Sequence, residues 1–465
     1  MQTDRLARSF LVSGLALLTA AGAALGAAGA FVTGFGDNEG GARYLPSPGT
    51  ATRAHALTTD AAGRFVAAGE NDRGDWILGR VDLDGSPDPS FGDGRAELPG
   101  LVVTSDGMTG GTARDLAFLP TGRILVAGRV ASAQGGGSFA VRRYSSGGVL
   151  DARFGDGGTV RTDVLDDRNG GANAIATHML GGDPSTTRII AAGFRSPAAN
   201  GAHRPAIVRL RPGGTLDPSF GRSGVVGELP GIGTAEIYDL QVLADGGIVA
   251  VGDTATPTAR PMMVRLKPDG SPDETFGGGS GVVVAPRPTE CLSASYRSVV
   301  IDPDGRIVVG GTARCDGRSA GSQFLFARFL SDGTRDVGFA TIGSALFPAQ
   351  DTTDKINAII RQFDGSIVGV GVTGTGERPR PAVVRLRSDG TPDERFGESG
   401  VATGVGPGST GGGADAVAIG RDGHLVTAGW ATIGAEEQAA LMKYDGSAAG
   451  PTSDEQTATA DQTRG

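Results

Sequence analysis

Seven polar residues stand at the same position of a repeated pattern, and they are the groups best placed to do chemistry. Each lies two residues before the first apolar residue of a recurring strand, and the residue type changes from unit to unit. They are His55, Arg114, Asn173, Tyr238, Arg297, Asn357 and Asp415. If these side chains converge on one cavity, they form a ligand-binding site. The alternative is that they only bond neighbouring strands or face water.

An enzyme could be built from the same positions. His55 would then be a general base or a ligand, with Asp415 as its neighbour, and Arg114 and Arg297 would hold an anionic group. The chain has four histidines, and the seven positions contain no paired carboxylates, triad or metal-ligand set. The sequence therefore favours binding over catalysis, with no catalytic residue, no metal and no cofactor.

A second set of residues recurs at one spacing and indicates a structural role. In six units a basic residue precedes an aspartate by eight residues. These pairs are Arg80/Asp88, Arg143/Asp151, Arg209/Asp217, Arg265/Asp273, Arg328/Asp336 and Arg385/Asp393. We expect each aspartate to bond turn amides and its arginine. Lys443 is the exception, because Val32 stands where its aspartate would be.

The elements that position these residues repeat about every 60 residues, which is typical of a repeat architecture. The motif TLDPSFGRSG at 215–224 returns around five further phenylalanines: Phe91, Phe154, Phe276, Phe339 and Phe396. A second landmark, an apolar strand that follows a glycine turn, occurs seven times, as in GRILVAG at 122–128. Each unit predicts four short strands, which we call a to d in chain order. Four antiparallel strands repeated radially form a β-propeller blade.

The predicted fold is therefore an all-β, seven-bladed β-propeller of four-stranded antiparallel blades. A seventh Phe-Gly pair, Phe35-Gly36, lies ahead of the first unit, and the last unit stops at Gly446 where its strand d should begin. We expect the N-terminal strand to close the last blade, which leaves no open sheet edge at the ring closure.

The N-terminal 30 residues differ from the rest. Arg5 and Arg8 precede an apolar run that ends in Ala28-Gly29-Ala30, the pattern of a secretory signal peptide cut near Ala30. The alternative is an uncleaved membrane anchor. The predicted domains are a signal peptide (1–30), the propeller (31–446) and a disordered polar tail (447–465). We expect a protein that is secreted or in the cell envelope, with no membrane span after cleavage.

Charge and cysteine content narrow the functional classes. The net charge of −9 and the absence of a Lys/Arg run argue against nucleic acid as a partner. The two cysteines, Cys291 and Cys315, flank a hairpin centred on 302–305, and antiparallel pairing brings them opposite each other. We predict a disulfide.

The unit DG-x-LD-x-x-FG-x-x-G, following a signal peptide, resembles the delta-60 repeat family of bacterial exported proteins. The resemblance covers essentially all of 31–446 and implies a propeller-like repeat protein, but it implies no activity and no catalytic residues. Repeat five departs from the motif, with Phe339-Ala340 in place of Phe-Gly.

The predicted function is that of an exported, monomeric binding or scaffold protein. The a–b and c–d turns keep nearly one length, whereas the b–c and d–a connections vary and emerge on one face, the loop face. The partner would be a protein, an envelope glycan or a small polar ligand, and Tyr44, Trp76 and Trp430 are the aromatics best placed for a broad surface. The alternative is a hydrolase or lyase with its site at the mouth of the central channel.

Overall fold

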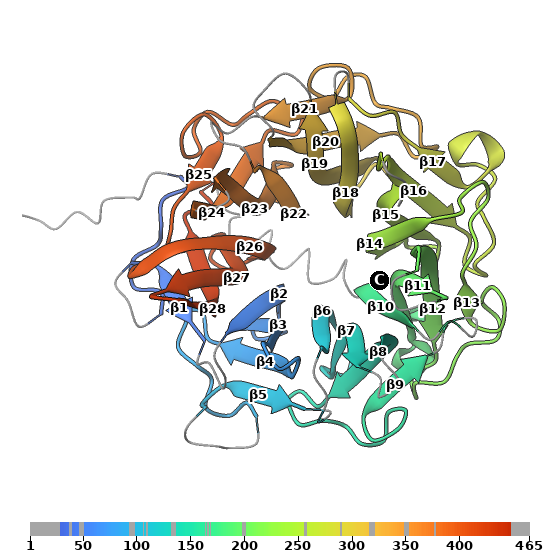
Figure 1. Ribbon diagram of the computed structural model, residues 1–465, viewed down its shortest axis with the longest axis horizontal. Helices are drawn as coiled ribbons and strands as arrows, with labels where there is room; N and C mark the ends of the chain where they lie inside the picture. Colours follow the sequence, from blue (N-terminus) through green and yellow to red (C-terminus); the bar gives the residue numbers. More distant parts are fainter. Residues whose placement is uncertain are drawn as a thin grey trace, which may run out of the picture.

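The computed structural model contains seven four-stranded antiparallel sheets arranged in a ring (Figure 1). It describes residues 28–36, 40–45, 51–92, 98–105, 107, 110–131, 136–162, 164, 167, 169–197, 201–254, 258–288, 291–315, 321–347, 353–375 and 378–447. The predicted signal peptide up to residue 27 and the predicted tail from 448 lie outside these residues. Within them, no helix combines the length and apolar character needed to cross a membrane.

Each blade has its strand a nearest the axis and its strand d at the rim (Figure 1). The strands of blades 1 to 3 are β2 Thr52–Thr59, β3 Phe65–Asn71, β4 Trp76–Val81, β5 Leu101–Thr104; β6 Thr112–Phe118, β7 Ile124–Ala131, β8 Gly137–Tyr144, β9 Thr159–Thr162; β10 Asn169–His178, β11 Arg188–Ser196, β12 Arg204–Leu210, β13 Val225–Val226. Those of blades 4 to 6 are β14 Ala235–Val242, β15 Ile248–Thr254, β16 Pro261–Leu266, β17 Val282–Val284; β18 Cys291–Ile301, β19 Ile307–Cys315, β20 Ser322–Phe329, β21 Ser344–Phe347; β22 Lys355–Arg361, β23 Ile367–Thr375, β24 Arg378–Leu386, β25 Val401–Thr403. The short 3-10 helices are η2 Leu180–Gly182, η3 Pro184–Thr186 and η4 Gly277–Gly279.

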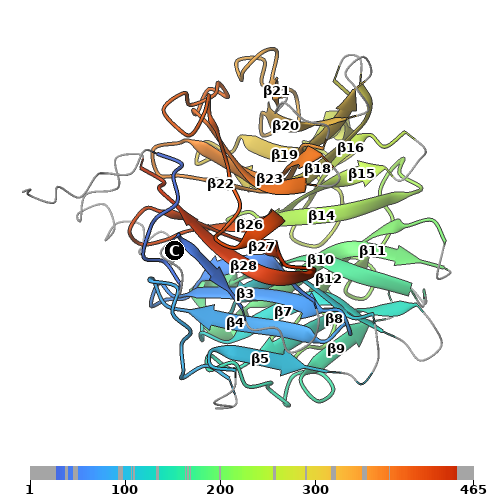
Figure 2. The ribbon, with the colours of Figure 1, turned by 60° about the vertical axis from the view of Figure 1, so that its left-hand side comes forward.

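Blade 7 combines both ends of the chain, as the sequence predicted. Its strands are β26 Ser409–Ile419, β27 Leu425–Ile433, β28 Glu436–Tyr444 and the N-terminal β1 Ala42–Tyr44. β1 pairs antiparallel with β28, with Ala42 opposite Met442. Figure 2 brings this blade forward, with the blue N-terminal segment beside the red strands. The backbone hydrogen bonds between β1 and β28 therefore join the N-terminal segment to the last repeat and close the ring.

The hydrophobic core is divided into seven clusters, one at each junction between neighbouring blades. The motif phenylalanine belongs to this core and contacts the next blade. Phe91 of blade 1, for example, packs against Gly148 in the c–d turn of blade 2, where a Cβ would lie 2.8 Å from the ring. The repeated Phe-Gly and Asp-Gly motifs therefore fit one blade onto the next.

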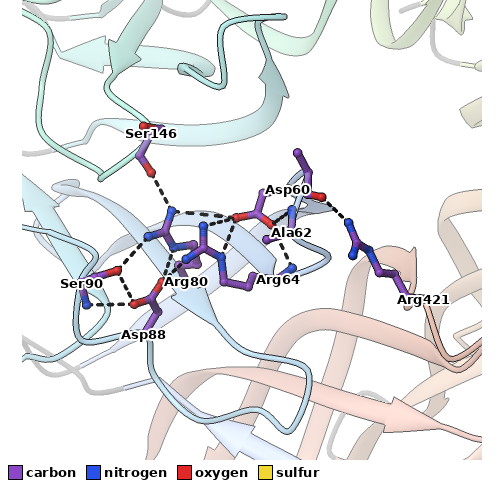
Figure 3. Close-up of polar contacts among 9 residues, drawn as sticks. Asp60, Ala62, Arg64, Arg80, Asp88, Ser90, Ser146 and Arg421 are labelled. Carbon is purple, nitrogen blue, oxygen red and sulfur yellow. Dashed lines mark hydrogen bonds and ion pairs between the residues drawn. The ribbon is translucent and has the colours of Figure 1, made fainter. Parts of the chain in front are cut away.

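The predicted Arg–Asp pairs form in all six units and also bind the next blade. In blade 1, Arg80 donates to Asp88 Oδ2 at 2.8 Å and to the Ser146 carbonyl of blade 2 at 2.6 Å (Figure 3). The Arg80 guanidinium also lies 4.4 Å from the centre of the Phe91 ring. The six pairs and their N–O distances are Arg80–Asp88 2.8 Å, Arg143–Asp151 3.0 Å, Arg209–Asp217 3.0 Å, Arg265–Asp273 2.9 Å, Arg328–Asp336 2.7 Å and Arg385–Asp393 2.6 Å.

Lys443, the exception to the Arg–Asp spacing, has an acidic partner from a different turn. Its Nζ lies 2.6 Å from Asp422 Oδ2 and donates to the Leu83 carbonyl of blade 1 at 3.2 Å. Asp422 comes from the a–b turn of blade 7 instead of from a c–d turn. The ion pair is therefore kept although the motif aspartate is absent.

The two cysteines form the predicted disulfide. Cys291 at the start of β18 is opposite Cys315 at the end of β19 in the antiparallel register, and their sulfur atoms are bonded. A disulfide is compatible with an extracytoplasmic protein. It fixes the base of the b–c loop of blade 5 on the loop face.

The fifth repeat keeps the backbone of the others despite its altered sequence. Ala340 adopts a positive φ of 48°, as do the glycines at the same motif position, whose φ ranges from 49° at Gly221 to 104° at Gly92. Its amide donates to the Asp389 carbonyl of blade 6 at 2.7 Å. The contact between neighbouring blades therefore imposes this turn even on a residue with a Cβ.

Candidate functional site

Each of the seven polar positions is the extra residue of a β-bulge in strand a. The register skips one residue at His55, Arg114, Asn173, Tyr238, Arg297, Asn357 and Asp415 in turn. The residue before each bulge is buried, whereas the bulged residue itself is half-buried. A bulge breaks the two-residue alternation of the strand and redirects one side chain. Here it turns seven side chains toward the axis.

A glycine of strand b lies opposite every bulge. A Cβ on any of these glycines would overlap a backbone carbonyl of strand a, well inside the 3.0 Å that real Cβ atoms keep. The glycines are Gly69, Gly128, Gly193, Gly252, Gly311, Gly371 and Gly429. They are the final glycines of the seven apolar motifs. Glycine recurs at this position because the bulged strand leaves no room for a side chain.

The seven bulged residues line one cavity of about 500 Å³ at the axis, the axial cavity. Its other lining residues are Arg53, Thr112, Arg129, Gly171, Ala172, Phe194 and Glu236. They come from the beginnings of a strands and the ends of b strands, so the cavity opens on the loop face. Its volume lies in the range of sites for small molecules. A ligand-binding role for these residues stays a prediction.

The sequence analysis did not identify Arg53, Glu236, Arg129 or Phe194. Arg53 and Glu236 each stand two residues before a bulged residue. Residues two apart in a strand point to the same face of the sheet. Arg129 and Phe194 directly follow the recurring strand-b glycine. That position in the seven blades holds Glu70, Arg129, Phe194, Asp253, Thr312, Val372 and Trp430. Comparing the units at this second position would have pointed to the same cavity.

His55 lies between two carboxylates. Its Nδ1 is 2.9 Å from Asp415 Oδ2, and its Nε2 is 2.8 Å from Glu70 Oε1. Burial by itself lowers the pKa of His55, but the hydrogen bonds to Asp415 and Glu70 outweigh it and raise the pKa to about 9. The ring is therefore an imidazolium that donates from both nitrogens at neutral pH.

The raised pKa disfavours the alternative in which His55 acts as a general base. A base must be free of its proton at the working pH, and His55 with a pKa of about 9 is not. Arg114 Nη1 lies 3.3 Å from Nε2, but an imidazolium cannot accept its proton. Two cations are thus in contact on the cavity wall, balanced by the carboxylates of Glu70 and Asp415.

A titration of His55 tests this arrangement. Because its pKa is raised above the ordinary 6.5, its contribution to stability is complete below pH 6.5 and is lost as the pH rises through about 9. The facing charged groups are Arg53, Glu70, Arg114 and Asp415. We expect an NMR midpoint for His55 near pH 9, and a lower midpoint in Glu70→Gln. A midpoint near 6.5 in the wild type would contradict the assignment.

Some of the bulged residues bond neighbouring blades, which was the alternative to a ligand site. Asn357 donates to Asp415 Oδ1 at 2.8 Å and to the Ala414 carbonyl at 2.9 Å. Asn173 donates to Glu236 Oε1 at 2.9 Å, and Glu236 also contacts His203 Nδ1 at 2.9 Å. These residues rigidify the cavity walls.

Three arginines of the cavity have no such partner. Arg114, Arg129 and Arg297 make no ion pair with any carboxylate in the described part of the chain. Arg297 lies 3.7 Å from the centre of the Tyr238 ring, and Arg129 donates only to the Asn169 side chain, at 3.0 Å. Burial lowers the pKa of Arg129, and its Nε has no hydrogen-bond partner.

Elsewhere in the ring, four arginines with little exposure are ion-paired. Arg80, Arg195, Arg328 and Arg385, each with a side chain at most 8% exposed, all have an aspartate oxygen within 2.8 Å. The cavity also contains Arg53, whose two nitrogens bind the Glu437 carboxylate at 2.6 and 2.8 Å. Among the described residues, the three cavity guanidiniums differ from these four in having no ion pair, and they line a cavity in which an anion could bind them.

Buried acids lie directly after two of the bulged residues. Asp115 accepts the Leu116 amide at 2.8 Å and the Ile175 amide of blade 3 at 2.7 Å. Burial and the charge of Asp239 raise the pKa of Asp115 to about 8. Asp239 similarly accepts the Val299 amide of blade 5, at 2.9 Å. Both carboxyl groups bond the backbone between blades, and no group of three or more potential metal ligands occurs among the described residues.

Of the three aromatics expected on a broad binding surface, Trp76 is not available. It is 2% exposed and stacks under Arg142, with the guanidinium 4.4 Å from the ring centre. The prediction was wrong for Trp76 because its packing depends on a residue distant in sequence. Trp430 and Tyr44 are half-buried, Trp430 under Arg53 and Tyr44 with its hydroxyl donating to the Pro407 carbonyl at 2.9 Å, and their binding role stays a prediction.

Comparison with known proteins supports the repeat architecture. A family model described as a domain of unknown function (DUF5122), beta-propeller, matches residues 119–154, 188–220, 243–276, 303–339 and 362–396. Each segment runs from the end of strand a or the start of strand b to the motif phenylalanine. These units are repeats of a β-propeller repeat family, and the narrower delta-60 name stays a prediction. No curated protein matches the chain in sequence.

Several solved structures are similar in fold. One is an ulvan lyase of polysaccharide lyase family PL25, with 10% identity and a TM-score of 0.47 over 93% of this chain and 98% of that one. Another is the PQQ-bound aldose sugar dehydrogenase from Streptomyces coelicolor, with 15% identity and a TM-score of 0.40 over 71% and 94%. A third is Sqt1 from Chaetomium thermophilum, with 12% identity and a TM-score of 0.40 over 86% and 97%. At these identities and TM-scores, we take no ligand or activity from them.

Proposed function

We propose that the protein is an exported binding protein that recognises a small, negatively charged ligand in the axial cavity. The observation that carries the proposal is the set of three arginines, Arg114, Arg129 and Arg297, which line the cavity and make no ion pair with a carboxylate among the described residues. The other two cations of the cavity wall already have acidic partners, Arg53 in Glu437 and protonated His55 in Glu70 and Asp415, so the positive charge available to a ligand comes from these three arginines. This local excess of positive charge occurs in a chain whose net charge is −9.

The geometry favours a ligand with separate anionic groups. Arg114 lies on β6 of blade 2 and Arg297 on β18 of blade 5, so they reach the cavity from different parts of the ring (Figure 1). Phe194 and Tyr238 add aromatic surface to the walls. Carboxylated or sulfated saccharides and small polycarboxylates have this combination of charge and apolar faces.

We favour a small ligand over a protein partner because Trp76, one of the aromatics expected on a broad binding surface, is buried. A protein or larger glycan that contacts the wider loop face stays a prediction, because the b–c and d–a connections lie partly outside the described residues. The enzyme alternative, a hydrolase or lyase with its site at the mouth of the central channel, stays a prediction, which the raised pKa of His55 does not favour.

Ligand titrations of Arg→Ala variants test the proposal. Wild type should bind one or more of citrate, trigalacturonate and a sulfated disaccharide, measured by calorimetry, and neutral galactotriose should bind far more weakly. Arg114→Ala and Arg297→Ala should each reduce affinity by roughly 10- to 100-fold, the range for a lost charged hydrogen bond. Binding should also weaken as salt is raised.

Arg378→Ala is the matched control. Arg378 is an exposed arginine of β24 that lies in a different cavity, with Arg380, Gly404 and Val405. Its loss removes one positive charge without touching the axial cavity, so affinity should stay within about twofold of wild type. Equal losses in Arg378→Ala and Arg297→Ala would indicate general charge attraction and contradict a specific site.

A further inference from the structure

The c–d turn of every unit has one backbone pattern. Six such turns contain a glycine at positive φ, and the carbonyl before that glycine accepts the motif Gly or Ala amide of the preceding blade, as when Gly221 donates to the Asp269 carbonyl at 2.7 Å. The turn glycines are Gly85, Gly148, Gly214, Gly270, Gly333 and Gly390, with φ between 81° and 94°.

The seventh turn is made by Ala28, Gly29 and Ala30. Gly29 has a φ of 87°, and the Ala28 carbonyl accepts the Gly397 amide of blade 6 at 2.9 Å. Gly29 donates to the Asp445 carbonyl at 2.8 Å, and Asp445 donates to the Ala30 carbonyl at 2.8 Å. These bonds reproduce those of the first unit, where Gly85 donates to Asp82 and Asp82 donates to Ser86.

The sequence alignment of the turn agrees with this pattern. AGAFVTGFG at 28–36 matches DGSPDPSFG at 84–92 position by position, with both glycines and the phenylalanine in place. Phe31 forms an antiparallel bridge with Tyr444, as Pro87 does with Val81. The seventh repeat is therefore split inside its c–d turn, and its second half begins at Ala28.

We propose that residues 28–30 belong to the folded domain and that export processing cuts the chain before Ala28. The proposal rests on the expectation that the N-terminal apolar run is an export signal. A cut after Ala30 would remove all three backbone bonds, including the one from Gly397 of blade 6. The sequence offers a second A-x-A site, Ala21-Gly22-Ala23. A signal peptidase would use water to hydrolyse the amide after Ala23, which leaves a free amino group on Ala24.

Truncated chains test the structural part of the proposal. A chain that begins at Ala28 should unfold at the same temperature as one that begins at Ala24. A chain that begins at Phe31 should unfold roughly 3–6 °C lower, because it lacks three backbone hydrogen bonds. Equal unfolding temperatures for the chains that begin at Ala28 and Phe31 would overturn the proposal.

A pair of glycine variants separates the contact from backbone strain. Gly29 and Gly34 both have positive φ, at 87° and 83°. A Cβ on Gly29 would lie 2.9 Å from the Gly397 amide nitrogen, whereas one on Gly34 would meet nothing within 4 Å. Gly29→Ala should therefore lower the unfolding temperature more than Gly34→Ala. An equal effect would show that the turn makes no specific contact.

The processing site itself is read by mass spectrometry of the protein recovered from outside the cytoplasm of an expressing bacterium. We expect an intact mass and N-terminal peptide that begin at Ala24. Any cut that leaves Ala28 in the mature protein supports the proposal, whereas an uncut chain or a mature N-terminus at Phe31 would overturn the proposed processing.

Discussion

Replacing Asp393 by alanine is expected to lower the free energy of unfolding by about 3–5 kcal/mol, the range for breaking a buried ion pair. Asp393 is 0% exposed and its partner Arg385 is 1% exposed. Asp393 Oδ2 accepts from Arg385 Nε at 2.9 Å and from Nη2 at 2.6 Å. The variant would leave a fully buried guanidinium whose remaining bond is to the Gly446 carbonyl, at 3.1 Å.

The same carboxylate provides a matched control. Arg395 is 78% exposed and donates to Asp393 Oδ1 at 3.1 Å. Because an exposed ion pair contributes at most about 1 kcal/mol, Arg395→Ala should have little effect on urea unfolding. If Asp393→Ala were as mild as Arg395→Ala, the recurring Arg–Asp pair would not hold the blades together.

The pH dependence follows from the direction of the shift. Burial alone would raise the pKa of Asp393, but hydrogen bonds from Arg395 and Arg385 lower it below the ordinary 3.8. A lowered pKa means that the stabilisation is complete above pH 3.8 and is lost as the pH falls through the folded-state value. The gap in stability between wild type and Asp393→Ala should therefore narrow in acid. For the equivalent Asp217 the folded-state pKa is about 2.

The fold could be predicted because its determinants are local and repeated. The motif phenylalanine, the turn glycine and the Arg–Asp spacing each describe one contact, and each is present in nearly every unit. Blade number and the N-terminal closure then follow from counting. The seventh turn at Ala28 was missed because it keeps only the glycine of the Asp-Gly pair and none of the motif aspartates.

The candidate site was only partly predictable. Comparison of the units placed seven polar residues on one ring, but it did not show which of them are already paired. Asp415 is opposite His55 only because the ring closes, 360 residues apart in sequence. Arg297 lies over the Tyr238 ring and close enough to Asp253 of blade 4 to influence its pKa, and no local sequence pattern contains these contacts. Spacing predicts position, whereas charge balance is a property of the assembled ring.

Replacing Gly371 by alanine is the change expected to connect fold and site most directly. Gly371 lies opposite the bulge at Asn357, and a Cβ there would overlap the Lys355 carbonyl. Neither the backbone at Gly371 nor that at Lys355 can move away without breaking hydrogen bonds between β22 and β23. We expect a loss of about 3 kcal/mol or more in the free energy of unfolding, at the upper end for overpacking. Gly213→Ala, where a Cβ meets nothing within 4 Å, should be within about 0.5 kcal/mol of wild type.

The site should respond together with the fold. Opening the bulge moves Asn357 away from Asp415, to which it donates at 2.8 Å, and Asp415 in turn holds His55 at 2.9 Å. Under conditions where Gly371→Ala is still folded, the NMR midpoint of His55 should fall below about 9, because a displaced Asp415 no longer favours the imidazolium. An unchanged His55 midpoint in a destabilised Gly371→Ala protein would show that the bulge serves the strand pairing alone and does not position the cavity.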